Sequence, residues 1–129
     1  MSKKYKILTI LSIILIFIII AIVVIVNQMN KGLEKLNAQE IPVIDLTSVE
    51  DGTYLGYYSI PLISVEVEVT VINHQITEIV ILEHKNGQGK DGESIIDDVI
   101  NHQSIDIDFI SGSTYSSKAI LLAVGDALS

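Results

Sequence analysis

The chain has 129 residues, and the part that remains beside one apolar run of about 20 residues suffices for one small folded domain. It contains no cysteine, which excludes disulfides, thiolate metal sites and thiol catalysis. After Val26 the chain carries 16 acidic residues and five lysines, a formal charge of −11, which repels nucleic acid and excludes nucleic-acid binding.

Residues Ile7 to Val26 form the apolar run (ILTILSIILIFIIIAIVVIV), in which only Thr9 and Ser12 are polar. At a rise of 1.5 Å per residue, such a helix spans roughly 30 Å, the thickness of the hydrocarbon core of a membrane. The run is therefore predicted to be a single transmembrane helix. Three lysines precede it, so residues 1–6 are expected to be a cytoplasmic tail, and the C-terminal domain is expected to be extracytoplasmic.

A cleaved signal peptide is the alternative interpretation of this segment, because the segment is N-terminal and follows a basic stretch. However, the apolar run exceeds the usual length of the apolar core of a signal peptide, and no small-x-small cleavage site follows it. Without a cysteine after the run, a lipoprotein anchor is excluded. We therefore expect an uncleaved anchor in the cell membrane.

Residues 27–48 are predicted to form a stalk and linker. Met29, Leu33 and Leu36 recur at mild helical spacing, and the residues after them mix a proline with isolated aliphatic side chains. The folded domain is expected to comprise residues 49–129.

Alternating apolar and polar residues predict the strands of this domain. From Leu62 to Ile72, valines alternate with polar residues that include Glu66 and Glu68, a pattern typical of a half-buried antiparallel strand. The segment from Ile76 to Leu82 is predicted to be its return strand, and the segment from Tyr54 to Tyr58 a third strand. The two glutamates lie on the polar face, so we expect them to be solvated rather than a catalytic pair.

The second half of the domain is predicted to be mainly helical. A glycine-rich loop, His84 to Gly92, precedes a helix around Ile95 to Ile100, for which Asp91 or Ser94 could serve as the N-cap. Alternation then predicts one more strand from Ile105 to Ile110.

The last segment, Ser116 to Leu128, has helical spacing, with Gly125 as its only weak point. The resulting order β-β-β-α-β-α predicts an α+β domain in which one small antiparallel sheet packs against two helices.

A cluster of hydroxyl side chains at the start of the last helix is the strongest candidate site. The stretch Asp108 to Ser117 (DFISGSTYSS) places these side chains around Gly112. Free backbone N–H groups and the positive end of the helix dipole favour an anion such as a phosphate there. The alternative is an ordinary capped helix start, because Ser and Thr are preferred at N-caps.

Several motifs are similar to those of a known family. Asp108 to Thr114 (DFISGST) resembles the Asp-x-x-Ser-Gly-Ala-Thr sequence of the FMN-binding domain family, which includes subunits of the sodium-translocating NADH:quinone oxidoreductase and related membrane electron-transfer complexes. Asp51 to Gly56 (DGTYLG) resembles the family's Asp-Gly-x-Tyr-x-Gly, and His84 with Gly87 and Gly89 matches its His-x-x-Gly-x-Gly loop. The resemblance covers nearly the whole domain.

The resemblance implies that FMN is the cofactor. It also implies that Thr114 carries the FMN covalently as a phosphoester, attached by a dedicated flavin transferase. Position 113 is Ser where the family pattern usually has Ala. Tyr115 and Tyr54 are the candidates for stacking on the flavin ring. The expected cofactor-binding residues are Tyr54, His84, Gly87, Gly89, Asp108, Ser111, Gly112, Ser113, Thr114, Tyr115 and Ser116.

Two interpretations of His84 stay open: it contacts the flavin or positions the glycine loop, or it is a solvated side chain at the end of a strand. His74 and His102 are expected at the surface. Glu83 and Asp91 lie near His84 in the sequence, but without the ligand spacing of a known metal site, so we expect no metal.

The resemblance implies a membrane-anchored flavoprotein that passes electrons between membrane and extracytoplasmic redox partners. Such a protein is a carrier rather than a stand-alone enzyme, and it needs no catalytic residues of its own. One alternative is a flavin-free binding or scaffolding module with the same fold. Another is a reductase that acts directly on a small extracellular acceptor. The use of Ile, Lys and Asn, together with the absence of Arg, Trp and Cys, is typical of a low-GC bacterium.

Overall fold

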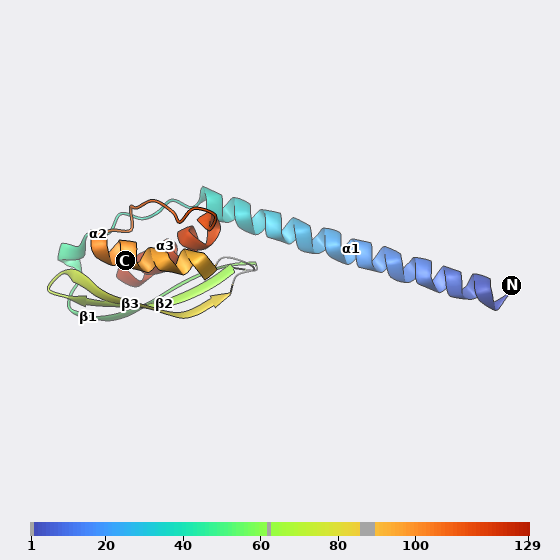
Figure 1. Ribbon diagram of the computed structural model, residues 1–129, viewed down its shortest axis with the longest axis horizontal. Helices are drawn as coiled ribbons and strands as arrows, with labels where there is room; N and C mark the ends of the chain where they lie inside the picture. The colour runs from blue at the N-terminus through green and yellow to red at the C-terminus, as the bar shows by residue number, and fades with distance from the viewer. Residues whose placement is uncertain (1, 62, 86–89) are drawn as a thin grey trace.

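The computed structural model describes residues 2–61, 63–85 and 90–129. One long helix, α1 (Lys3–Ala38), leads into a small body made of a sheet and helices (Figure 1). Among the described residues, α1 is the one helix long and apolar enough to cross a membrane, and its apolar stretch is not covered by the body. The remaining elements are η1 (Leu46–Ser48), β1 (Gly52–Ile60), β2 (Ile63–Ile72), β3 (Gln75–Lys85), η2 (Lys90–Ser94), α2 (Ile95–His102) and α3 (Thr114–Leu128).

The three predicted strands are confirmed as one antiparallel sheet in the order β1-β2-β3. The alternation of β2 explains its position in the centre, because its four valines are fully buried on one face. The turn between β2 and β3 is formed by Asn73 and His74, both with positive φ, as a tight two-residue hairpin requires. His74 and His102 are exposed, as expected.

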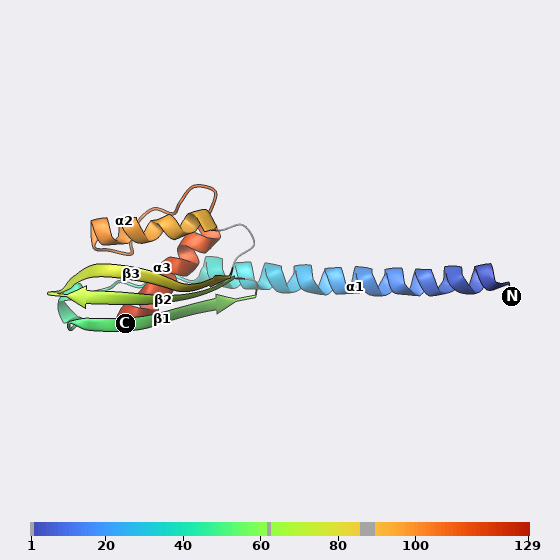
Figure 2. The same ribbon diagram turned by 60° about the horizontal axis from the view of Figure 1, so that its bottom comes forward.

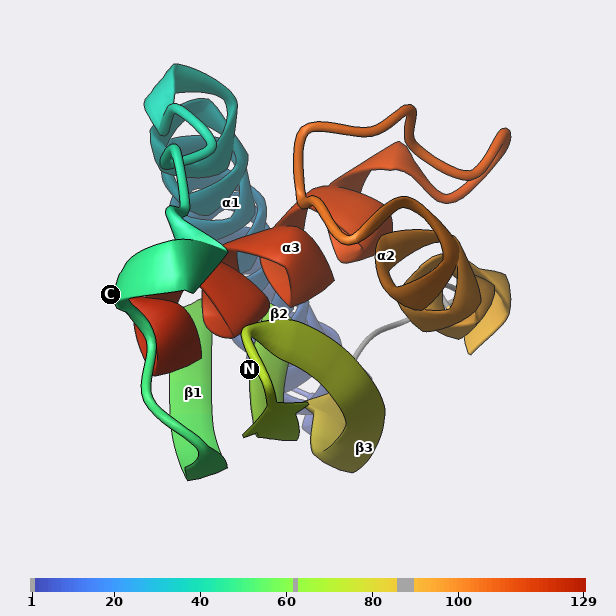
Figure 3. The same cartoon turned by 90° about the vertical axis from the view of Figure 1, so that its left-hand side faces the viewer.

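Both helices of the body lie on the same face of the sheet, where α3 covers β1 and β2 and α2 lies beside β3 (Figures 2 and 3). The core forms between the buried valines of β2 and apolar side chains of α3 such as Ile120 and Val124. The predicted α+β class, with two helices on one antiparallel sheet, is therefore confirmed.

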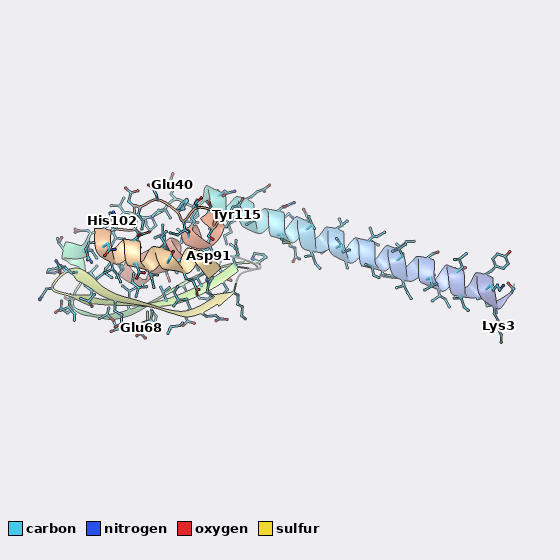
Figure 4. The ribbon with its side chains drawn as sticks, in the orientation of Figure 1. Lys3, Glu40, Glu68, Asp91, His102 and Tyr115 are labelled. Carbon is cyan, nitrogen blue, oxygen red and sulfur yellow. The ribbon has the colours of Figure 1, made fainter. Side chains whose placement is uncertain are left out.

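The opposite face of the sheet is open, and Glu68 points away from the helices there (Figure 4). Cross-strand partners share a face, so Leu55, Glu68 and Val80 lie side by side on it, as do Tyr57, Glu66 and Glu83. The prediction that the glutamates of β2 lie on the polar face of an amphipathic strand is confirmed.

The prediction of a strand from Ile105 to Ile110 is wrong, because no strand is assigned in this segment. The segment passes over the helices rather than along the sheet (Figure 2), so it has no neighbouring strand with which to pair. Its apolar side chains still pack against the core, with Ile105 buried. Its backbone bonds locally instead: the Ile110 N–H donates to Ser117 Oγ at 3.1 Å.

Both predicted helices are present. Ser94 precedes α2 as its N-cap residue but makes no side-chain capping bond. The last helix begins at Thr114, two residues before the predicted Ser116, so the candidate acceptor lies within its first turn. Gly125 does not interrupt it; a Cβ at this position would lie 2.7 Å from Pro42 Cγ, so the glycine lets the segment after α1 pack closely on α3.

The segment predicted as a stalk and linker is not a free connection, because it packs against the body. Residues 27–38 continue α1 without a break, and Leu36 is completely buried. Ile41 and Ile44, which follow, pack against the main core.

Gln103 joins α2 to the sheet and is expected to contribute strongly to stability. Its Oε1 accepts from the Ile76 N–H at 2.7 Å, and its Nε2 donates to the carbonyl oxygens of Ile76 at 2.8 Å and Ile100 at 2.7 Å. We expect Gln103→Ala to lower the free energy of unfolding by about 2 kcal/mol, because these backbone groups lose their partners. Urea unfolding in detergent, followed by tyrosine fluorescence, measures the loss. The exposed Asn101→Ala is the control, and an equal effect of both substitutions would contradict the prediction.

Candidate functional site

The N-terminus of α3 has backbone donors that no side-chain cap satisfies. Ser113 occupies the N-cap position without a side-chain capping bond, and the first turn contains no acidic residue. The first N–H to bond back is that of Ser117, which donates to the Ser113 carbonyl at 2.9 Å. The N–H groups of Thr114, Tyr115 and Ser116 precede that bond and have no intrahelical acceptor. Together with the helix dipole, they make this end of α3 suited to an anion.

A tight turn leads into this helix end. The Ser113 N–H donates to the Ile110 carbonyl at 3.0 Å, and Gly112, the third residue of the turn, has a φ of 80°. Glycine is favoured at this position because a turn of this kind requires positive φ. The hydroxyl of Ser117 accepts the Ile110 N–H, so a fully buried serine fixes the start of the turn. Gly112 thus allows the positive φ of the turn, and Ser117 holds the first residue of the turn.

The hydroxyl side chains of the motif divide into buried and exposed groups. Ser113 is only 7 % exposed, and Ser116 and Ser117 are also buried. Thr114 is exposed, although it adjoins Ser113. Of these two neighbouring hydroxyl residues, only Thr114 is exposed to solvent.

Two exposed aromatic side chains flank the motif. Phe109 is 38 % exposed and Tyr115 is 42 % exposed. Tyr115 lies at the end of the body where α1 joins it (Figure 4). Either ring is available for stacking with a planar ligand held near Thr114.

Gly92 packs η2 directly against the start of α3, a contact that the sequence analysis missed. A Cβ added at Gly92 would lie 3.1 Å from Ser116 Cβ, 3.2 Å from the Ser117 nitrogen and 3.3 Å from Ser113 Cβ. A third glycine in the predicted loop indicated that some segment approaches the backbone closely there. The sequence did not indicate which segment, because α3 begins more than 20 residues further along the chain.

His84 is not a solvated side chain, so that interpretation is wrong. Its side chain is only 2 % exposed, and Nδ1 lies 3.5 Å from Oε1 of Glu93, the residue after Gly92. The end of β3 is thereby connected to η2, which contacts the start of α3. No pattern in the sequence indicated Glu93 as a contact of His84. A role for His84 in positioning the loop that follows β3 is consistent with this geometry.

Other predicted site residues lie elsewhere. Tyr54 lies near the C-terminal end of α3, where it borders a hollow with Ala127 and Leu128 and donates to the Glu50 carbonyl at 2.6 Å. The 15 residues of α3 span about 20 Å, so the structure does not bring Tyr54 to Thr114.

Ser111 and Asp108 are exposed and precede the helix in the chain. Gly87 and Gly89 lie outside the described residues. Among the described residues, no three His, Asp or Glu side chains form a group that could hold a metal ion.

Comparison with known proteins identifies this domain. A family model described as the FMN-binding domain matches residues 63–129, which is more than half of the chain. The match includes β2, β3 and both helices of the body, and thus the Asp108 to Thr114 motif and His84. No curated protein and no solved structure gives a match. The chain therefore belongs to the FMN-binding domain family, and its cofactor is FMN.

Proposed function

We propose that this protein is a membrane-anchored flavoprotein that carries FMN covalently on Thr114 and passes electrons between membrane and extracytoplasmic redox partners. The observation that carries the proposal is the exposed threonine in the first turn of α3, within a domain of the FMN-binding family. Family membership favours this function over a flavin-free scaffolding module.

The residues at this helix end fit the phosphate of FMN. Three N–H groups without intrahelical acceptors and the helix dipole face a bound anion, and the first turn has no carboxylate to repel it. The chain has no arginine, so backbone donors take the place of the usual side-chain phosphate ligands. Bound FMN supplies a ring that accepts and donates electrons. Tyr115 and Phe109 are the exposed rings that can stack on it.

A covalent link suits an exposed site. In the proposed linkage, Thr114 Oγ1 loses its proton and bonds to the phosphorus, with a net gain of one FMN less one water. The flavin transferase supplies an activated flavin, whose bond from the phosphorus to its leaving group breaks as the bond to Thr114 forms, and the leaving group departs with the proton from Thr114. A tethered flavin rebinds as an intramolecular event at an effective concentration of about 1 mM, so it is not lost to the medium. A shallow binding surface then suffices.

The lysines that precede the apolar run support the proposed position of the body outside the cytoplasm. Lys3, Lys4 and Lys6 precede the apolar part of α1, and lysines near one end of a membrane helix favour the cytoplasmic side. The body would then lie on the outer side, where the flavin can exchange electrons with partners outside the cytoplasm. The flavin transferase must act on the same side.

Intact mass and visible absorbance test the proposed linkage. The full chain is expressed with and without an active flavin transferase, and a known flavinylated protein serves as a control for the enzyme. We expect the mass to rise by one FMN less one water only with the transferase, together with flavin absorbance after denaturation. An unchanged mass, with the control protein modified, would refute covalent attachment.

The contact of Gly92 with α3 gives a further prediction. We expect Gly92→Val to reduce flavin attachment severalfold, because the added methyl groups push η2 away from Ser113 and Ser116. The matched control is Asp91→Val, which changes the exposed neighbouring residue. The flavin-to-protein ratio at equal transferase activity measures the effect. Equal ratios for both variants would show that this contact is not needed.

A further inference from the structure

The last turns of α1 belong to the body as much as to the anchor. Met29, Gly32, Leu33 and Leu36 recur at the spacing of one helix face, and Gly32 and Leu36 are buried. Leu36 is 0 % exposed and packs in a small apolar cluster with Ile60 of β1 and Leu122 of α3, which we call the joint. The joint thus connects α1 to two different elements of the body.

Two further contacts fix the joint. A Cβ added at Gly32 would lie 3.0 Å from Pro61 Cδ, so the glycine allows the turn after β1 to approach the helix closely. On the other side, Lys118 Nζ of α3 donates to the Asn37 carbonyl at 3.1 Å. A cation at this position also interacts favourably with the negative end of the α1 dipole. Contacts on two sides restrict both tilting and rotation of the body.

The helix has no break between the apolar run and the joint, since α1 is continuous from Lys3 to Ala38. From Val26 to Leu36 it rises about 15 Å, so the joint would lie close to the membrane surface. A stiff helix of this length transmits its own orientation to the body.

The site for FMN lies at the end of the body that faces the anchor. The turn that contacts Gly32 joins β1 to β2 at this end, and Lys85, the last residue of β3, pairs with Ser64 just after that turn. Tyr115, in the first turn of α3, lies near the junction with α1, whereas the C-terminus lies further from it (Figures 1 and 4). Gln75, at the other end of β3, marks the far end of the body.

We infer that α1 and the body form one rigid rod that holds the Thr114 end of the body toward the membrane surface. The inference rests on the proposed function for the identity of the ligand at Thr114, but the orientation itself is independent of it. A flavin at this end would be reached most directly by a redox partner that lies in the membrane or at its surface. The joint is therefore a positioning element for electron exchange.

The two ends of β3 provide a matched test of the orientation. The chain has no cysteine, so Lys85→Cys and Gln75→Cys each place one thiol at an exposed position of the same strand. The two positions are about 33 Å apart along the strand. A nitroxide is attached to each variant of the full chain in vesicles of a neutral lipid that contain a lipid-bound paramagnetic chelate. We expect relaxation by the chelate to be several times stronger at position 85 than at position 75.

Variants of the joint test its role. In each labelled background, Leu36→Ser is expected to bring the two relaxation rates together, because a polar side chain replaces the buried anchor of the joint. The adjacent Lys35→Ser, which changes an exposed residue of the same helix, is expected to preserve the difference. Equal rates at both positions without a joint variant, or faster relaxation at position 75, would refute the inferred orientation. A full difference in Leu36→Ser would refute the role of the joint. The measurement needs no flavin, so it stands apart from the test of covalent attachment.

Discussion

Replacing Thr114 with alanine is expected to abolish covalent attachment of FMN, whereas replacing the adjacent Ser113 with alanine is expected to leave it unchanged. Both residues carry a hydroxyl next to Gly112, but Ser113 is only 7 % exposed and packs near Gly92, while Thr114 is exposed. A transferase can bring an activated flavin only to the accessible hydroxyl. Ser113→Ala also restores the residue usual in the family pattern, so the turn should tolerate it.

Intact mass after coexpression with an active transferase measures both variants. Thr114→Ala should have the mass of the unmodified chain, and Ser113→Ala should gain one FMN less one water in full. Tyrosine fluorescence confirms that both variants fold. The reverse pattern, with attachment lost only in Ser113→Ala, would place the flavin on Ser113.

Gly56→Ala is expected to unfold the body or to lower its free energy of unfolding by about 3 kcal/mol or more. The backbones of β1 and α3 meet at this glycine: a Cβ there would overlap the carbonyl oxygen of Ala123 and would lie 2.7 Å from Ala127 Cβ. Neither neighbour is a flexible side chain that could move aside, so α3 must shift away from the sheet. This loss is a large fraction of the stability of a typical small domain.

The matched control for Gly56→Ala is Leu55→Ala on the same strand. Leu55 lies on the open face of the sheet and is largely exposed, so its truncation should cost about 1 kcal/mol or less. Urea unfolding in detergent and resistance of the body to protease distinguish the two. If Gly56→Ala were as stable as Leu55→Ala, the close approach of α3 to β1 would be contradicted.

The sheet and the membership of the FMN-binding domain family could be predicted from the sequence because their determinants are local. The valines of β2 alternate with the period of a strand, and Asp108 to Thr114 is a contiguous motif. The segment from Ile105 to Ile110 has the same alternation, but a strand also needs a partner, and this segment passes over the helices. Its alternation therefore buries isoleucines without forming a ladder.

Contacts between distant segments could not be predicted in the same way. Gly92 meets Ser116 across two separate elements, and nothing in either segment alone indicates the other. The packing of Leu36 against the body could not be predicted either, because mild apolar spacing after a membrane helix is equally typical of a free stalk. The position of Tyr54 depended on the direction in which α3 crosses the sheet, which is a tertiary property.

The open face of the sheet also affects whether two copies of the chain can associate through this face. Anchored proteins diffuse in two dimensions and collide often, and a bare sheet face with exposed Leu55, Tyr57 and Val80 would favour stacking of one copy on another. The carboxylates of Glu66 and Glu68 stand among these apolar side chains, so two copies that approach face to face bring like charges together. The charges on this face therefore oppose its stacking on the same face of a second copy.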